Sequence, residues 1–91
     1  MQSDHEIIRQ VLGGSKELYA VLVERYQRMV FKTVAGILRD PAERENAAQE
    51  TFLQAYRLLH TYQYRGFKTW LARIAVHKAI DLQRKAQRDK A

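Results

Sequence analysis

Residues 67–85 read FKTWLARIAVHKAIDLQRK, and this stretch decides the fold. Its apolar side chains recur at steps of three and four, the spacing that places residues on one face of an α-helix. The residues on this face are Trp70, Leu71, Ile74, Ala75, Ala79 and Leu82. We therefore predict a helix over residues 67–88 whose apolar face packs inward.

Upstream of this stretch, the same spacing predicts a first helix over residues 4–12. Asp4 is the expected N-cap, and Gly13-Gly14 ends the helix because glycine tolerates the left-handed geometry of a helix C-terminus. The residues expected on its inner face are Ile7, Ile8, Val11 and Leu12.

Two longer helices are predicted between these segments. One spans residues 16–38 with Ser15 as its cap, and Pro41 stops it because the residue before a proline avoids helical backbone angles. The other spans residues 42–59, since proline suits a first helical turn. The prediction is an all-α fold, a compact four-helix bundle that forms one domain over residues 1–91.

Several classes of function are disfavoured by what the chain lacks. It contains no cysteine, its three histidines (His5, His60 and His77) are far apart, and it has no glycine-rich phosphate loop. We therefore expect no enzyme, no metal site and no cofactor. No apolar run approaches the roughly 18 residues of a membrane-spanning helix. The first six residues do not resemble a secretory signal, so we expect a cytoplasmic protein without membrane insertion.

Charge is distributed unevenly along the chain. Residues 1–64 hold eight Lys/Arg and eight Asp/Glu, whereas residues 65–91 hold eight Lys/Arg against Asp81 and Asp89. The last third thus carries the whole net charge of +6. A basic segment on a neutral body is typical of a polyanion-binding protein, and it also fits a solvated C-terminal helix.

Aromatic residues gather just before and within this basic segment. Tyr56, Tyr62, Tyr64, Phe67 and Trp70 lie within fifteen residues. Aromatic rings offer stacking surfaces for unpaired bases, while cations hold the phosphate backbone, so single-stranded nucleic acid is the favoured ligand. The alternative is that Tyr56 and Trp70 are core residues. The other three rings border a short loop with little core to join.

The third predicted helix carries a polar stripe. Helical steps place Asn46, Gln49, Glu50 and Leu53 together, next to Glu45 and facing away from Ala48, Phe52, Ala55 and Leu59. Such a stripe fits a protein-docking face, with Leu53 as the apolar anchor, and it also fits an ordinary solvated helix face.

Two stretches resemble the extracytoplasmic-function (ECF) sigma factors of bacterial RNA polymerase. Residues 45–56, ENAAQETFLQAY, resemble the family signature E-D-x-x-Q-E-x-F-x-x-A-[YW], and residues 67–85 resemble F-x-T-W-L-x-R-I-A-x-N-x-x-I-D-x-x-R-[KR]. The resemblance implies a sigma region 2 domain, a helical bundle. It further implies that the residues binding the clamp coiled coil of the polymerase β′ subunit are Glu45, Asn46, Gln49, Glu50 and Leu53.

The resemblance also implies that the loop at residues 60–68 and the last helix bind the single non-template strand of the promoter −10 element and melt the duplex, with one base flipped into a pocket at the loop. The candidate DNA-binding residues are Tyr62, Tyr64, Arg65, Phe67, Lys68, Trp70, Arg73, His77 and Lys78. Anti-sigma factors are possible further partners, as they often cover these surfaces in the family.

The sequence departs from the family pattern in several places. Asn46 replaces the usual Asp, which should weaken docking, and His77 replaces a common Asn, which could alter base preference. The loop at residues 61–66 lacks the family's frequent Asp-Pro-Gly-type stretch. The −35-binding domain of the family is absent from this chain, and we expect an excised domain. The alternatives from other classes are a helical protein-interaction module and a generic basic duplex-DNA binder.

Overall fold

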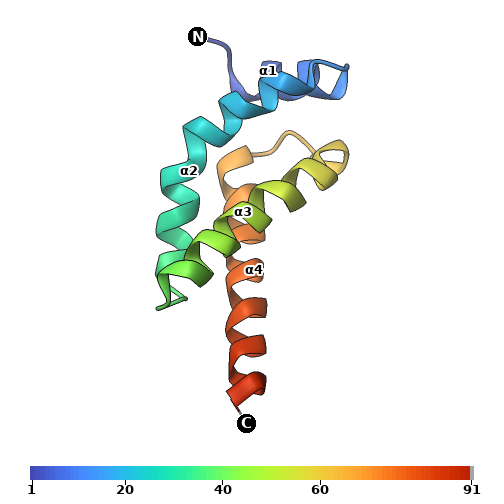
Figure 1. Cartoon of the computed structure of the whole chain (residues 1–91). Coiled ribbons are helices and arrows are strands. Elements are labelled where there is room, and N and C mark those ends of the chain that lie inside the picture. Colours follow the sequence, from blue (N-terminus) through green and yellow to red (C-terminus); the bar gives the residue numbers. More distant parts are fainter. Residues whose placement is uncertain (91) are drawn as a thin grey trace.

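The arrangement of helices follows the predicted order. In a computed structural model, the described part of the chain is residues 1–90, with side chains as far as Asp89. Its elements are α1 (Asp4–Leu12), the short 3₁₀ helix η1 (Lys16–Leu18), α2 (Tyr19–Ala35), α3 (Pro41–Leu58), the 3₁₀ helix η2 (Leu59–Thr61) and α4 (Phe67–Lys90) (Figure 1). Residues 1–90 contain no strand, so the prediction of an all-α bundle of four helices is confirmed.

The start of α1 corrects one prediction. Ser3, not Asp4, is the N-cap, because Ser3 Oγ accepts a hydrogen bond of 3.2 Å from the backbone N–H of Glu6. The Asp4 carboxylate turns towards α2 instead. There Arg25 Nη1 donates to Asp4 Oδ1 at 3.0 Å, and the hydroxyl of Tyr26 donates to Asp4 Oδ2. Asp4 therefore joins two helices rather than capping one.

The other helix boundaries lie close to the predicted ones. The segment predicted as one helix divides into η1 and α2, and the side chain of Ser15 makes no capping hydrogen bond. α3 begins at Pro41 itself, since the fixed φ of proline suits the first helical position. α4 begins at Phe67 as predicted and continues to Lys90.

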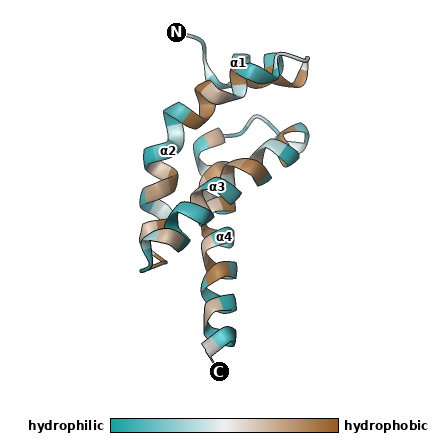
Figure 2. Cartoon of the chain, viewed as in Figure 1, coloured by the Kyte–Doolittle hydropathy of each residue, from teal (hydrophilic) through white to brown (hydrophobic). Residues whose placement is uncertain are grey.

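The core lies where α2, α3 and α4 cross, with α1 covering one end (Figure 1). The hydropathy colouring in Figure 2 shows apolar patches alternating with polar ones along each helix. The buried residues of the three long helices are Leu22, Val30 and Val34 of α2, Ala47, Thr51 and Ala55 of α3, and Phe67, Leu71, Ala75 and Ala79 of α4. Alanines at the crossings let the backbones approach closely.

Two predictions about buried faces were wrong. Leu12 is 46% exposed because α1 buries only its other apolar residues. The polar stripe of α3 was expected to face away from Ala48 and Phe52, but Glu45 and Gln49 border the same groove as the partly buried Ala48 and Phe52, and the inner face centres on Ala47, Thr51 and Ala55. Thr51 is tolerated there because its hydroxyl donates to the carbonyl of Ala47 at 2.7 Å.

The C-terminal part of α4 extends beyond the other helices. The molecule is therefore elongated, at 46 × 22 × 22 Å (Figure 1). The last described side chains of α4 are mostly exposed. No helix in the described part of the chain has both the length and the apolar character needed to span a bilayer.

Two tyrosines tie α2 to its neighbours. The hydroxyl of Tyr19 donates to the carbonyl of Phe52 in α3 at 2.6 Å, and that of Tyr26 donates to the Asp4 carboxylate in α1. Burial raises the pKa of Tyr26 to about 12, and the hydrogen bond to Asp4 adds to the effect. Burial, with a smaller contribution from Tyr56, also raises the pKa of Tyr19. Folding therefore favours the neutral form of both phenols.

We expect the free energy of unfolding to fall as the pH rises from about 10 towards 12. Below the unfolded tyrosine pKa of about 10 both states are protonated and this contribution to stability is complete. Above it the unfolded state loses protons first, so the contribution is lost. Urea denaturation across this range should show a shallower alkaline loss of stability for Tyr26→Phe than for the wild type. Equal pH slopes in the variant and the wild type would contradict the assignment.

Candidate nucleic-acid interface

A five-residue connector, residues 62–66, joins η2 to α4 and forms one side of the candidate site. Two of its residues have left-handed backbone angles, Gly66 with φ 70° and Tyr64 with φ 61°. Glycine adopts this geometry freely, whereas a side chain makes it cost about 1–2 kcal/mol. The Gly66 carbonyl accepts a hydrogen bond of 3.1 Å from the N–H of Trp70, which starts α4 directly after the connector.

The connector and the first turns of α4 enclose a hollow of about 390 Å³, here called the connector cavity. Its lining residues are Thr61, Tyr62, Gln63, Arg65, Thr69, Trp70 and Arg73. The volume falls within the roughly 300–1,000 Å³ of small-molecule sites. The lining offers two aromatic rings, those of buried Tyr62 and half-buried Trp70, with two guanidinium groups, one amide and two aliphatic hydroxyls. These are the groups that stack on a base, pair with phosphate and hydrogen-bond to base edges.

Two of the predicted stacking rings belong to the core instead. Tyr62 is 5% exposed and Phe67 is 3% exposed, so the expectation that the loop rings have little core to join was wrong for these two. They pack on one another with ring centroids 5.6 Å apart, and Phe67 also meets Tyr26 of α2 at 5.4 Å. Burial raises the pKa of Tyr62. The covering helices α1 and α2 supply the core that local spacing did not reveal.

Trp70 is half-buried and stands over these rings. Its ring centroid lies 5.2 Å from that of Tyr62 and 5.6 Å from that of Phe67. The buried rings of Tyr62 and Phe67 therefore hold one side of the indole, while another part of it lines the connector cavity. Of the four rings predicted to bind DNA, Trp70 has the best placement for stacking on a base.

The remaining predicted DNA-binding residues fall into separate groups. Arg65 and Arg73 are exposed and line the connector cavity, and exposed His77 lies one helical turn beyond Arg73 on the same face of α4. Tyr64 is half-buried against α1, with the guanidinium carbon of Arg9 5.2 Å from its ring centroid.

Lys68 is exposed but does not line the connector cavity. Lys78 lines a different hollow, on the α3 side of α4. The side chain of Lys90, counted in the basic segment, lies outside the described residues.

Three residues of the connector cavity were missed by the sequence analysis: Thr61, Gln63 and Thr69. Thr69 could have been found from helical spacing, because it lies one turn before Arg73. Thr61 and Gln63 carried no such signal, since they lie outside regular α-helix and their directions depend on how the connector turns. The Thr61 hydroxyl is itself engaged, donating to the Leu58 carbonyl at 2.6 Å.

The polar stripe of α3 is divided between two grooves. Glu45 and Gln49 border a largely apolar α2–α3 groove of about 670 Å³. Asn46 and Glu50 border an α3–α4 groove of about 360 Å³, opposite Lys78, Lys85 and Arg88. Leu53, 50% exposed, lies one helical turn from Gln49 on the ridge of α3. The five predicted docking residues thus share one exposed side of α3.

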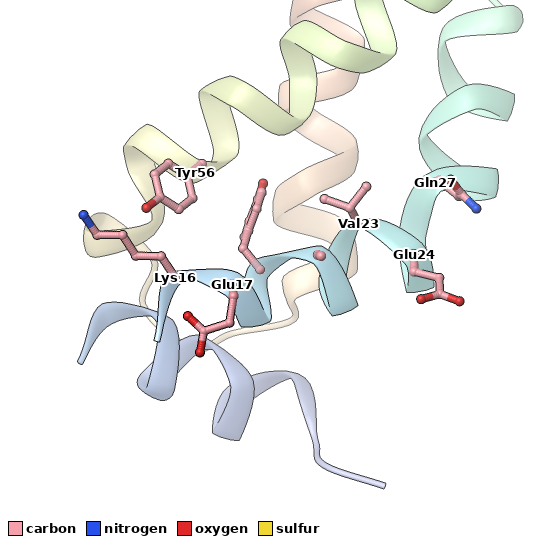
Figure 3. A pocket seen from close by; sticks show the side chains of 8 residues that line it. Lys16, Glu17, Val23, Glu24, Gln27 and Tyr56 are labelled. Carbon is pink, nitrogen blue, oxygen red and sulfur yellow. The ribbon is translucent and has the colours of Figure 1, made fainter. Parts of the chain in front are cut away.

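A further hollow of about 500 Å³ adjoins the α2–α3 groove and shares Val23 and Gln27 with it. Figure 3 shows Tyr56 of α3 facing Lys16 and Glu17 across this hollow. Phe31, 44% exposed, and Tyr56, 38% exposed, add apolar surface to this side of the molecule. The α2–α3 side therefore offers the larger apolar surface, and the connector cavity the more cationic one.

No group of three or more potential metal ligands occurs in the part of the chain that the structure describes. His5 is engaged by the aromatic cluster, where 3.0 Å separates its Nε2 from the hydroxyl oxygen of Tyr62.

Comparison with known proteins gives consistent matches. A family model described as sigma-70 region 2 matches residues 22–89. The RNA polymerase sigma-H factor of Pseudomonas aeruginosa is 33% identical over 79 residues, which cover 86% of this chain and 41% of that protein. The ECF RNA polymerase sigma factor SigW of Bacillus subtilis is 35% identical over 83 residues, covering 90% of this chain and 44% of SigW.

The chain thus spans about two-fifths of the length of these relatives. Among solved structures, an NMR structure of an engineered region 2 of sigmaE in complex with GTAAAA is similar, with a TM-score of 0.90 and 31% identity. The match covers 97% of this chain and 93% of that one, so it includes the connector and the start of α4.

Proposed function

Because the chain belongs to the sigma-70 region 2 family, we propose that it recognises the promoter −10 element as unpaired non-template DNA while docked on core RNA polymerase. The observation that carries this proposal is the connector cavity, where Arg65 and Arg73 flank the half-buried Trp70. The similarity to a sigmaE domain in complex with GTAAAA supports it, because the same fold there holds a short oligonucleotide.

Within the connector cavity each group has a distinct role. The indole of Trp70 stacks on one unpaired base, a contact worth roughly 1–3 kcal/mol. Arg65 and Arg73 bind phosphates on either side of that base, and Gln63 and Thr69 hydrogen-bond to its edge. These contacts offset the few kcal/mol needed to take a base out of the stack, which is how binding drives melting of the duplex.

Binding of labelled single strands to the domain tests this proposal. We start from GTAAAA and change one base at a time, measuring affinity by fluorescence anisotropy at fixed salt. At one or more positions a wrong base should cost about 1–3 kcal/mol, or roughly 5- to 150-fold in affinity. Equal affinity for every strand, or for a random duplex, would reject it and leave a generic basic DNA binder.

The second half of the proposal concerns the exposed side of α3. The carboxylates of Glu45 and Glu50 lie on the same side of α3 as the exposed side chain of Leu53, an arrangement that fits a basic partner helix with an added apolar contact. We assign this surface to the clamp coiled coil of the polymerase β′ subunit. An anti-sigma factor that blocks initiation would have to cover this surface or the connector cavity.

Replacing Leu53 by alanine should weaken binding to core polymerase by about tenfold or more, since central apolar anchors dominate such interfaces. Leu12→Ala is a matched control, because Leu12 is 46% exposed and Leu53 is 50% exposed, on different helices. Binding of both variants to immobilised core polymerase, and to the single strand, should show a loss only for Leu53→Ala and only towards polymerase. Equal polymerase affinities for the two variants would place docking elsewhere.

A further inference from the structure

The backbone of Tyr64 is held in a conformation that large side chains rarely adopt. Its φ of 61° lies in the left-handed region, and nothing about a tyrosine side chain favours this geometry. Such a residue keeps its conformation only where surrounding contacts over-determine it. The contacts around its ring therefore show what holds the connector in place.

Two residues of α1 supply these contacts. The ring of His5 meets that of Tyr64 edge-on at 5.1 Å, and the guanidinium carbon of Arg9 lies 5.2 Å from the centroid of the Tyr64 ring. His5 also reaches Tyr62, with 3.0 Å between His5 Nε2 and the tyrosine hydroxyl oxygen. The two connector tyrosines lie 5.2 Å apart, centroid to centroid. His5 and Arg9 thus form a brace, here called the α1 brace, against both tyrosines.

The helix that carries the α1 brace is itself fixed to α2. Asp4 accepts hydrogen bonds from Arg25 and Tyr26, and Arg25 Nη2 also donates to the carbonyl of Gln2 at 2.6 Å. Figure 1 shows α1 lying across the end of the bundle from which the connector emerges. The helix that contacts the connector, α1, is therefore held in place by its hydrogen bonds to α2.

Residues next to Tyr64 in the connector, and the ring of Tyr62, link the contacts made by α1 to the connector cavity. Gln63 and Arg65, the two neighbours of Tyr64 in the chain, both line it. Tyr62 packs on Trp70, with ring centroids 5.2 Å apart. A change of φ at Tyr64 would redirect both neighbours, and a displaced Tyr62 ring would free the indole.

We propose that His5 and Arg9 are positioning residues that hold the connector in the conformation that accepts an unpaired base, and that they set affinity and base preference without touching the DNA. This inference rests on the proposed function of the connector cavity. Without the α1 brace the connector samples other conformations, and the apparent affinity falls in proportion to the fraction that remains competent.

The test compares the double variant His5→Ala/Arg9→Ala with wild type, using the preferred strand from the single-base panel. If the competent fraction falls to about a tenth, affinity drops about tenfold. Discrimination between bases should shrink, and iodide should quench the single tryptophan, Trp70, more strongly. Gln10→Ala/Arg39→Ala is the control, because it also removes one exposed arginine and one residue of α1.

The salt dependence of binding separates positioning from direct contact. The double variant should keep the wild-type slope of log affinity against log salt concentration. A slope less steep by about 0.7 would mean that Arg9 binds a phosphate, and would overturn the proposal. Unchanged affinity with unchanged base discrimination would overturn it too. If wild type itself shows no preference for single strands, the proposed function fails instead.

A second variant guards against a general loss of folding. Tyr64→Gly removes the ring that the α1 brace contacts and accepts the left-handed backbone without strain. In this background, adding Arg9→Ala, whose guanidinium lies over the Tyr64 ring in the wild type, should cost no more than about twofold further, as expected for residues that act through one another. A further loss of about tenfold would show that Arg9 acts independently of Tyr64, which contradicts the proposal.

Discussion

Replacing Leu71 by alanine is expected to lower the free energy of unfolding by about 2–5 kcal/mol. Leu71 has 0% of its surface exposed and belongs to the cluster that α4 forms with the other helices. Its removal loses apolar burial and leaves a cavity among close-packed neighbours. Since domains of this kind have a total stability of only about 5–15 kcal/mol, the variant should lose a large part of its stability.

Urea denaturation followed by circular dichroism measures this effect. Leu12→Ala serves as the control, because Leu12 is 46% exposed and its truncation should change stability by no more than about 0.5 kcal/mol. Similar losses for the two variants would mean that α4 is not packed through Leu71 as the structure shows.

The second large effect concerns DNA binding. We expect Arg65→Ala/Arg73→Ala to weaken binding to the preferred single strand by more than tenfold, because removing a charged hydrogen bond costs about 1.5–3 kcal/mol. The slope of log affinity against log salt concentration should also become less steep by about 1.4, which corresponds to roughly 0.7 for each phosphate that the variant no longer neutralises. Anisotropy titrations from low to moderate salt measure both quantities.

The matched control is Lys32→Ala/Arg39→Ala, which removes two exposed cations near the C-terminal end of α2, away from the connector. It lowers net charge equally but should leave the salt slope unchanged. If both double variants lose affinity to the same extent, overall charge and not the connector cavity governs binding. Together with the unaltered slope expected for the α1 brace variant, this result distinguishes phosphate-binding arginines from a positioning one.

Helix positions were predictable because periodicity is a local property of the sequence. α4 begins at Phe67, as predicted, since the change from the connector to a three- and four-residue spacing is visible in the sequence itself. The cap of α1 was misplaced by one residue because Ser3 and Asp4 are both good caps. Only the structure shows that Asp4 is engaged by Arg25 and Tyr26.

The faces of α3 were harder to predict. Hydrophobicity alone places Phe52 inside and Thr51 outside, whereas Thr51 is buried and satisfies its hydroxyl on the Ala47 carbonyl. A shift of one residue around a helix rotates its face by about 100°, which is enough to divide the polar stripe between two grooves.

The conformation of the connector and the burial of its rings could not be predicted from local sequence patterns. Whether Tyr62 and Phe67 are free to meet a base depends on α1 and α2, and His5 and Tyr62 are 57 positions apart in the chain. The cluster of aromatic and basic residues did indicate the region of the connector cavity, and Arg65, Trp70 and Arg73 line it as one set. The residues that support them came only from the tertiary structure.

The most direct measurement is an NMR titration of the ¹⁵N-labelled domain with its preferred single strand. Binding of an unpaired base in the connector cavity predicts that the largest shifts fall on the indole N–H of Trp70 and on the backbone amides of Gln63, Arg65 and Thr69, with smaller ones along the face of Arg73 and His77. Shifts gathered in the α2–α3 groove or on the last turns of α4, with the Trp70 indole signal unmoved, would contradict it.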